Sequence, residues 1–347
     1  MLNDYRMGGL GMFMKDTGAG ETLCRVSIES PDSLTATWRD HRLALRWTCP
    51  FVLPPWLNAW WKVFGRDAEP LVAVVRQDEA IVGIAPLMLQ DRMVRFLGGP
   101  DVCDFFDFAV VPGKEDLFIT TLVGYLSSQG LKDLDLGPAR PDAIVQKLFS
   151  ESGPFSSIEC HNRREDVSVE LDLPSTWDEF LGALNGKQRH ELRRKLRRLH
   201  EAGAVRFRLV DDMTRIPAAV ETFLALFTMN RKDKAEFMTG RMASFFRSLS
   251  LALAEEGLLR LFFLDVDQRP VASVFCFDHQ GTRYLYNSGY DDGYQEISVG
   301  LMSKVLSLKD AIDEGLRTYD FLKGSEEYKY RLGGKEIPLS RCHVTIR

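Results

Sequence analysis

The sequence lacks the features that mark a membrane or secreted protein. None of its apolar runs reaches the roughly 20 residues that a membrane-spanning helix needs. The first twenty residues, rich in Gly and Met, lack the apolar core of a signal peptide. We therefore expect a cytoplasmic protein in which residues 1–24 form a flexible leader without a function of their own.

Metal-ligand spacing is also missing. The six cysteines contain no C-x-x-C pair, and they stand at positions 24, 49, 103, 160, 276 and 342. No two histidines have the H-x-x-x-H spacing, and "HELRR", which begins at His190, lacks the second histidine of a zinc protease. We predict that the protein binds no metal and that its cysteines are reduced and mostly buried.

Positive charge is the minority charge. The chain has 44 Lys and Arg against 49 Asp and Glu, a net charge of -5, which argues against nucleic acid as a partner. One stretch departs from this balance: "KQRHELRRKLRRLHEAG", residues 187–203, holds seven Lys or Arg and one Glu in its first fourteen positions. This local positive charge needs a local explanation.

The basic stretch has the period of a helix. Its leucines form one stripe, and Arg189, Arg193 and Arg197 form a second stripe at i, i+4 and i+8. Three interpretations remain open: a solvated helix face, a nucleic-acid recognition helix, or a face that binds phosphate. Arginine suits the third because its planar fork binds phosphate oxygens in pairs.

The two halves of the chain repeat one order of elements. Residues 71–89 and 259–277 each have the alternation of two strands joined by a polar turn. Each half then continues with an extended segment, an amphipathic helix and a short strand, the helices lying at about 115–128 and 300–314. Similar segments recur at nearly the same offset, which predicts an internal duplication.

Motifs in the last third resemble a known family. They are Gly289-Tyr290-Asp291 after an aromatic strand, Ser298-Val299-Gly300 before a helix, and Asp320-Phe321-Leu322-Lys323-Gly324 followed by Tyr328-Lys329. These resemble the CelD/BcsL (BioF2-like) acetyltransferases of the GCN5-related N-acetyltransferase (GNAT) superfamily, relatives of the FemABX peptidyltransferases. Val299 replaces the family's usual proline. The basic stretch and "FLGGPDVCDFFDF" in the first half also resemble the family, so the likeness covers about residues 35–340.

The resemblance implies a fold and a division of the chain. The fold class is α/β (α+β), with tandem duplicated GNAT domains in which helices flank a mixed, mostly antiparallel sheet. We expect a first GNAT-like domain at residues 25–165 and a second at 166–347. The first lacks an evident pyrophosphate-binding segment, so we expect the acyl-CoA site in the second.

The resemblance also implies a donor site for acetyl-CoA or another acyl-CoA. The pyrophosphate would lie on backbone N–H groups at a helix N-terminus, and the pantetheine along Asn287 and Ser288. The helix N-terminus comprises Ser298, Val299, Gly300, Leu301 and Met302. An ordinary N-cap serine with a glycine in the first turn explains the same residues.

For the chemistry, the resemblance implies Lys329 as the group that stabilises the carbonyl oxyanion. Asp320 is a candidate to accept the nucleophile's proton, and Tyr328 and Tyr290 are candidates to donate to the leaving thiolate. Each has a structural alternative: a surface lysine, a turn-capping carboxylate, and tyrosines that pack. Cys276 lies in an apolar strand, where a thiol has a raised pKa and is a poor nucleophile.

Further residues are candidates for substrate binding. Arg189, Arg193 and Arg197 suit phosphate groups, Tyr290 lies near the donor site, and Asp104 and Asp107 are candidates to line a groove between the repeats. Turn-forming carboxylates explain the last two equally well.

The family implies an acyl-CoA-dependent acyltransferase, for N- or O-acyl transfer to a cell-envelope or exopolysaccharide precursor such as a lipid- or nucleotide-linked sugar. Peripheral association with a membrane polysaccharide machinery would fit this substrate class. The alternatives are a FemABX-like aminoacyl-tRNA-dependent transferase and a non-catalytic accessory protein of polysaccharide biosynthesis. The sequence leaves the acyl group, the acceptor and the oligomeric state open.

Overall fold

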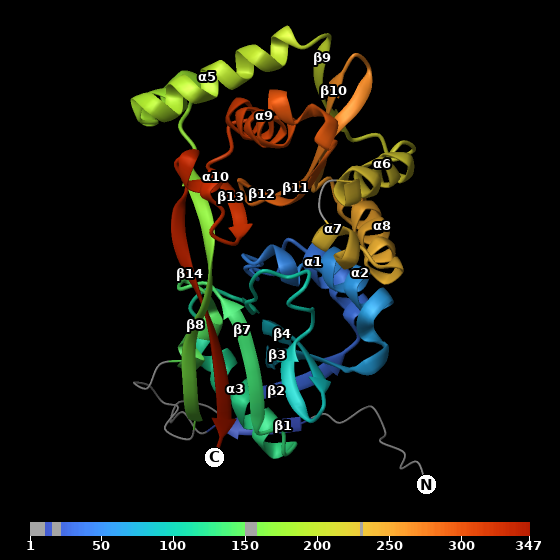
Figure 1. The fold of residues 1–347 in the computed structure, drawn as a ribbon. Helices are drawn as coiled ribbons and strands as arrows, with labels where there is room; N and C mark the ends of the chain where they lie inside the picture. The colour runs from blue at the N-terminus through green and yellow to red at the C-terminus, as the bar shows by residue number, and fades with distance from the viewer. Residues whose placement is uncertain (1–10, 16–21, 150–157, 230–231) are drawn as a thin grey trace. The chain divides into compact units, whose positions relative to one another are not determined.

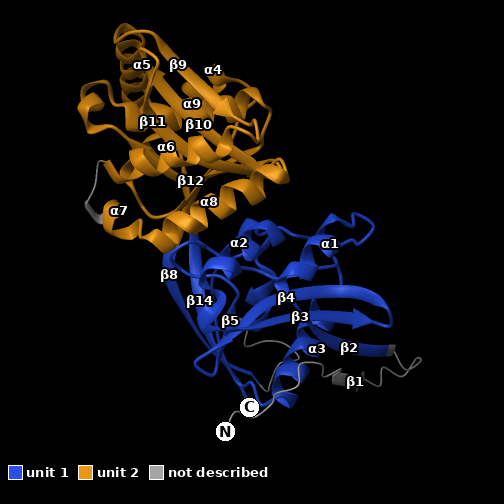
Figure 2. Cartoon of the chain, turned by 90° about the vertical axis from the view of Figure 1, so that its right-hand side faces the viewer, with its two compact units in different colours: residues 1–166, 338–347 blue, residues 167–337 orange. Residues whose placement is uncertain are grey.

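The computed structural model describes residues 11–15, 22–149, 158–229 and 232–347 (Figure 1). Two compact units divide the chain: residues 1–166 with 338–347, and residues 167–337 (Figure 2). The expected second domain ran to the end of the chain, whereas residues 338–347 pack with the first unit. Within the expected leader, residues 11–15 and 22–24 lie in strands, and the other residues are outside the described ranges.

The first unit contains a mixed sheet in the order β1-β2-β3-β4-β5-β7-β14, with β6 beside β4. Neighbouring strands are antiparallel except β5 and β7, which are parallel. The strands are β1 (Gly11–Lys15), β2 (Thr22–Glu29), β3 (Glu69–Gln77), β4 (Ala80–Gln90), β5 (Met93–Phe96), β6 (Ala109–Val110) and β7 (Asp133–Ala139), and the helices are α1 (Leu34–Arg39), α2 (Pro54–Phe64) and α3 (Glu115–Ser128).

The second unit contains a sheet in the order β8-β13-β12-β11-β10-β9. Its strands are β9 (Val205–Val210), β10 (Leu259–Val266), β11 (Arg269–His279), β12 (Thr282–Tyr290) and β13 (Thr318–Lys323), and two strands, β8 (Ile158–Asp172) and β14 (Lys335–Ile346), run from one unit into the other. Its helices are α4 (Trp177–Ala183), α5 (Gly186–Glu201), α6 (Ile216–Met229), α7 (Lys232–Phe237), α8 (Gly240–Glu255), α9 (Val299–Asp313) and α10 (Glu327–Arg331). No helix in the described part of the chain is both long and apolar enough to cross a membrane.

The predicted repeat is present in the backbone. In the hairpin turns β3–β4 and β10–β11, Asp78 and Asp267 both adopt left-handed φ values, of 53° and 49°. Gly130 and Gly315, which follow α3 and α9, both have φ of 71°, the conformation that favours glycine after a helix. Each unit thus carries the same hairpin–strand–helix–strand order, and the fold is a tandem of GNAT-type domains.

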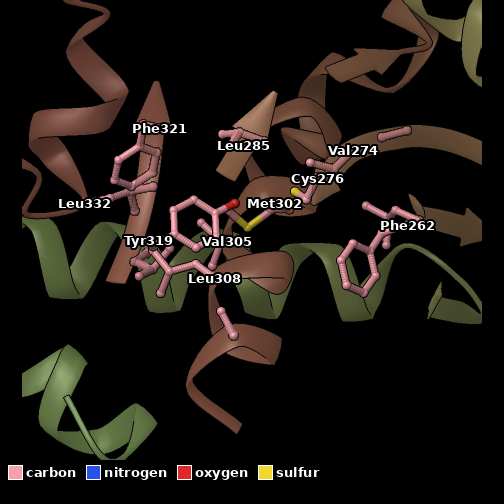
Figure 3. Close-up of a cluster of buried hydrophobic side chains, with 14 of the residues drawn as sticks. Phe262, Val274, Cys276, Leu285, Met302, Val305, Leu308, Tyr319, Phe321 and Leu332 are labelled. Atoms are coloured by element: carbon pink, nitrogen blue, oxygen red, sulfur yellow. The ribbon is translucent and has the colours of Figure 1, made fainter. Parts of the chain in front are cut away.

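The sheet of the second unit is buried on both faces because β11 is apolar on both. One face places Val274 and Cys276 in a cluster with Met302 and Val305 of α9 (Figure 3). On the other face, Phe275 contacts Phe223 of α6. Burial raises the pKa of the Cys276 thiol to about 12, as expected for a thiol in an apolar strand.

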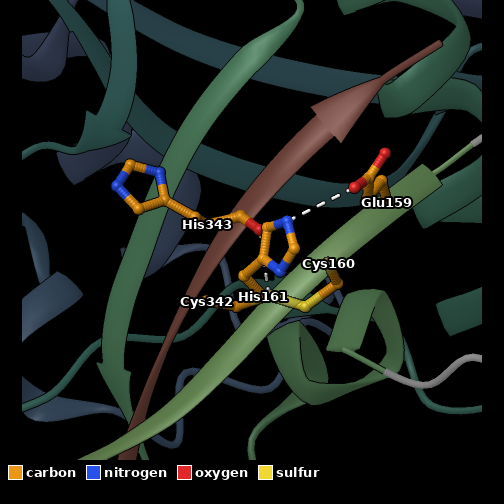
Figure 4. Close-up of a disulfide and its surroundings, with 5 residues drawn as sticks. All are labelled: Glu159, Cys160, His161, Cys342 and His343. Atoms are coloured by element: carbon orange, nitrogen blue, oxygen red, sulfur yellow. Dashed lines mark hydrogen bonds and ion pairs between the residues drawn. A yellow bond between two sulfur atoms is a disulfide. The ribbon is translucent and has the colours of Figure 1, made fainter.

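Two of the six cysteines differ from the expectation of reduced thiols. Cys160 of β8 and Cys342 of β14 form a disulfide, with their Cα atoms 6.2 Å apart (Figure 4). The strands that carry them are neighbours in the sheet. The other four cysteines are buried thiols. Because the two cysteines are 182 residues apart, the sequence did not indicate that they pair.

A buried arginine fixes the C-terminal half of α9 against the sheet. Arg283 of β12 has no solvent exposure and donates to both carboxylate oxygens of Asp278, at 2.8 and 2.9 Å. It also donates to Asp310 of α9 at 2.5 Å and to the Ser307 carbonyl at 3.1 Å. This network joins β11, β12 and α9 opposite the N-terminus of the helix.

We predict that Arg283→Met lowers the free energy of unfolding by about 3 kcal/mol, because it removes the Arg283 partner of the partly buried Asp310 carboxylate, while Asp278 keeps Arg260 as a partner. Urea unfolding followed by circular dichroism measures this loss. Arg331→Met is the matched control, since Arg331 forms an exposed pair with Glu327 and should change stability by about 1 kcal/mol or less. Equal losses in the two variants would contradict a structural role for Arg283.

Candidate functional site

The site begins where β12 and β13 separate. The two strands pair in parallel only from Thr282 and Thr318 to Tyr284 and Asp320. Beyond that point Leu322 adopts a left-handed φ of 61° and turns β13 away. The rest of β12 therefore leaves one edge without a parallel partner, as the acyl-CoA notch of the predicted fold requires.

Asp320 holds this turn. Its carboxylate accepts the Leu322 N–H at 2.7 Å and the Ser168 hydroxyl at 2.9 Å, and only 1% of the residue is exposed. A carboxylate held by a backbone amide and a hydroxyl below the surface positions the chain. The turn-capping alternative accounts for these contacts, and the role of Asp320 in accepting the nucleophile's proton stays a prediction.

The N-terminus of α9 follows β12 and a short 3-10 segment, Asp292–Ile297. Ser298 precedes the helix with a left-handed φ of 56° and does not cap it with its side chain. Among the described residues, the N–H groups of Val299 and Gly300 have no hydrogen-bond acceptor. Gly300 is required here because a Cβ atom would lie 2.5 Å from the Tyr290 ring. The first turn of α9 thus presents two N–H groups that an anion could accept.

These groups lie at a pocket of about 440 Å³. It is lined by Lys195, Tyr290, Gln295, Ser298, Val299, Gly300, Leu301, Lys304 and Tyr328. Six of these residues were predicted site residues: Tyr290, Ser298, Val299, Gly300, Leu301 and Tyr328. In the described part of the chain its lining includes two lysines and no carboxylate, so the pocket has a positive potential.

Lys195 was missed within the basic stretch. Its ammonium donates to the Ser298 hydroxyl at 2.7 Å and lies 3.6 Å from Glu191. A lysine beside the positive end of a helix dipole is electrostatically unfavourable unless an anion compensates both. On α5 it lies next to the buried positions Leu192 and Leu199, which was the available signal that this lysine faces inward.

The arginine stripe points elsewhere. Arg189 donates to the carbonyls of Leu181, Gly182 and Leu184, at 3.3 to 3.4 Å, and so caps the end of α4. Arg193 and Arg197 are exposed, and helical geometry puts them on the side of α5 away from Lys195. None of the three lines this pocket, to which α5 contributes Lys195, and their role in binding a substrate stays a prediction.

Lys304 was also missed, although it lies one turn after Gly300 on the same face of α9. Its ammonium donates to the Gly300 carbonyl at 2.7 Å and lies 5.3 Å from the centre of the Tyr328 ring. Burial lowers the pKa of Lys304 to about 7, and the positive charge of Lys234 acts in the same direction. Lys304 can therefore change its charge near neutral pH.

Lys329 is buried, with 2% of the residue exposed. Its ammonium donates to the carbonyls of Leu322, Lys323 and Gly324 at 2.9, 2.8 and 3.0 Å, and lies 2.9 Å from the Glu326 carboxylate. All three N–H bonds are thus committed to the turn after β13. These contacts hold the turn, and the role of Lys329 in stabilising an oxyanion stays a prediction.

Tyr328 lies beside Lys329 but faces the pocket. Burial raises the pKa of its hydroxyl well above the ordinary value, and the negative charge of Glu326 adds to this effect. The hydroxyl therefore stays protonated at neutral pH, as a proton donor to a leaving thiolate would need.

The remaining predicted positions differ in their outcome. Asn287 and Ser288 lie on the part of β12 beyond its pairing with β13, and the Ser288 carbonyl accepts the Lys234 ammonium at 2.6 Å. Met302 is fully buried in the core and does not line the pocket. A pantetheine pairing with Ser288 would have to displace Lys234.

Asp104 and Asp107 lie in the first unit, outside this pocket. The Asp107 carboxylate accepts the N–H groups of Phe108 and Val145 at 2.8 and 3.0 Å. Burial raises its pKa to about 7. These bonds give Asp107 the structural role that was the alternative. Among the described residues, no group of three His, Cys, Asp or Glu side chains is placed to hold a metal ion.

Comparison with known proteins finds a match to one family within the second unit. Residues 186–330 match the family model described as an acetyltransferase (GNAT) domain. This segment runs from α5 into α10 and contains every residue that lines the pocket. A search of the curated proteins found no match to the chain.

Solved structures extend the likeness to the first unit. FemX has a TM-score of 0.59 at 11% identity, over 91% of this chain and 96% of that chain. A conserved protein of unknown function from Bacteroides thetaiotaomicron has 0.55 at 13%, over 92% and 99%. L-PGS from Bacillus licheniformis has 0.53 at 10%, over 83% and 90%. Such identities show the fold, in which the second GNAT-type domain carries the pocket.

We predict that Lys329→Met lowers the free energy of unfolding by about 2–4 kcal/mol, because it leaves several buried carbonyls without a donor. Thermal and urea unfolding of the purified protein measure this. Lys335→Met is the control: it removes a lysine from an exposed pair with Asp172 and should change stability by about 1 kcal/mol or less. A fully stable Lys329→Met protein would restore the catalytic interpretation.

Proposed function

We propose that the chain is an acyltransferase that uses an acyl-CoA as donor and transfers the acyl group to an amino or hydroxyl group. The observation that carries this proposal is the pocket at the start of α9. Its described lining has two lysines and no carboxylate, and two of its N–H groups have no acceptor among the described residues. Such a site suits a diphosphate. The GNAT match over the same residues supports an acyl-CoA as its source.

The proposed acceptor is a cell-envelope or exopolysaccharide precursor in the cytoplasm, such as a lipid- or nucleotide-linked sugar. Support for this class comes from the motifs that resemble the CelD/BcsL acetyltransferases. A large acceptor would reach the donor through the notch between β12 and β13.

An acyl-CoA supplies a thioester whose carbonyl carbon a nucleophile can attack. The residues of this chain would hold it and manage protons around it. The amides of Val299 and Gly300, with Lys195, would bind the diphosphate. Tyr328, whose hydroxyl keeps its proton, would donate a hydrogen bond to the leaving sulfur. Asp320 and Lys329 would keep the turn after β13 in place.

A second candidate function is transfer from an aminoacyl-tRNA, as the FemABX resemblance implies. It is favoured by the fold shared with FemX and by the outer face of α5, where Arg193 and Arg198 are exposed and have no ion pair with any described residue. The net charge of -5 counts against it. A non-catalytic accessory protein would keep the fold without needing the pocket's charge.

Calorimetric titration of the ribonuclease-treated protein with acetyl-CoA tests the donor. We predict that Lys195→Met weakens binding about tenfold or more, since a charge-assisted contact contributes about 1.5–3 kcal/mol. Arg193→Met is the matched control: it removes one positive charge two residues away on the opposite side of α5, and should change affinity less than twofold.

Other outcomes separate the candidates. If Arg193→Met and Lys195→Met weaken binding equally, the donor is attracted by the overall positive charge of α5 and not by a contact with Lys195 in the pocket. If acetyl-CoA and longer acyl-CoAs do not bind, tRNA with and without an attached amino acid is compared by filter binding. Binding of the aminoacylated tRNA that Arg193→Met weakens would replace the first candidate with the second. Binding of neither donor would favour the accessory protein.

A further inference from the structure

The two lysines of the pocket have different surroundings. Lys195 reaches it from α5 and has a carboxylate, Glu191, 3.6 Å away. Lys304 stands on α9 itself, partly buried, with its ammonium near the Tyr328 ring and on the Gly300 carbonyl. A carbonyl and a ring face stabilise an ammonium less than a carboxylate does.

The other charged groups near Lys304 do not supply such a partner. From α7, Lys234 repels its charge, and from α10, Lys329 does the same. Glu326, just before α10, acts in the opposite direction, whereas the Cys276 thiol of β11, with its pKa of about 12, carries no charge near neutral pH. The Glu326 carboxylate lies 2.9 Å from the Lys329 ammonium, so it is already shared. Burial and the neighbouring positive charges thus place the pKa of Lys304 at about 7.

We infer that Lys304 takes up a proton when a phosphate or diphosphate group binds in this pocket, so that anion binding and the charge of one lysine are coupled. The anion would add negative charge beside an amine that now faces two positive neighbours. An opposite charge at this range favours the protonated amine. The proposed acyl-CoA is one source of that anion, and to this extent the inference rests on the proposed function.

The coupling between protonation of Lys304 and anion binding fixes the sign with which the affinity changes with pH. Below about pH 7 Lys304 is already protonated, so binding there needs no proton. Above pH 7 the free site is neutral and the bound site is protonated, so affinity falls as the pH rises, by up to about tenfold per pH unit. The loss ends at the pKa that Lys304 has in the complex.

A purely structural Lys304 would behave differently. If its role is to cover the Gly300 carbonyl and the Tyr328 ring, its charge does not change on binding. Affinity would then vary with pH only through the ligand, and both probes below are fully ionised at pH 8 because the last phosphate pKa is about 6.

The test is calorimetry in pairs of buffers with different enthalpies of ionisation, at equal pH and ionic strength: Tris and HEPES at pH 8, bis-Tris and MES at pH 6. Acetyl-CoA and ADP are titrated separately into the full-length protein at each pH. The difference in heat between the buffers gives the number of protons taken up. We expect a value approaching one at pH 8; at pH 6, where the ligand phosphate itself titrates, we expect the value found for Lys304→Arg.

Three variants make the result specific to Lys304. Lys304→Met should show no proton uptake at pH 8 and weak binding at both pH values. Lys304→Arg should show no uptake at pH 8 but keep its affinity there, because its charge is permanent. Lys309→Met removes an exposed lysine of the same helix, paired with Asp313, and should behave as the unmodified chain.

The outcomes also separate this inference from the proposed function. Proton uptake with ADP but no binding of acetyl-CoA would keep the inference and remove the proposed donor. Binding of acetyl-CoA without uptake at pH 8, or with uptake that persists in Lys304→Met, would overturn the inference and leave the donor in place. Binding of neither probe would overturn both.

Discussion

The site depends on the turn that takes β13 away from β12. When the two strands stop pairing, the backbone after Asp320 loses its ladder partners, and buried groups without partners cost about 1–3 kcal/mol each. Two buried side chains replace the lost bonds: the Asp320 carboxylate accepts the Leu322 N–H, and the Lys329 ammonium binds three carbonyls from Leu322 to Gly324. The two strands can stay apart because these side chains form hydrogen bonds with the backbone groups of the turn.

The pocket also shows why a net charge says little about a site. The chain is acidic overall, yet the start of α9 gathers two lysines around helix N–H groups without acceptors. Each of these charges alone would be unfavourable there, since the helix dipole already makes this end positive. An arrangement of this kind is stable only if burial suppresses one charge or an anion neutralises the sum, and Lys304 meets the first condition.

Local patterns predicted the elements of the fold, and the three-dimensional surroundings decided the roles of the residues. The helix at 115–128 and the hairpins followed from periodicity and turn residues, which the sequence displays directly. The contacts of Asp320 and Lys329 did not. Asp320 accepts from Ser168, which is distant in sequence, and the left-handed turn at Leu322 that brings three carbonyls to Lys329 has no sequence signal. The arginine stripe was correctly placed on a helix, but the rotation of α5 that points Lys195 inward is set by tertiary packing.

The duplication explains why the second unit carries the anion pocket. In the first unit, α3 begins with Glu115 and Asp116, and the Glu115 carboxylate accepts the Gly113 N–H at 3.1 Å. These carboxylates neutralise the positive end of the α3 dipole and would repel a phosphate. In the second unit, α9 begins with Val299 and Gly300, which leave the same end of the helix uncompensated. The two helices, in equivalent positions of the repeats, thus differ in charge at their first turn: α3 carries two carboxylates there, and α9 carries none.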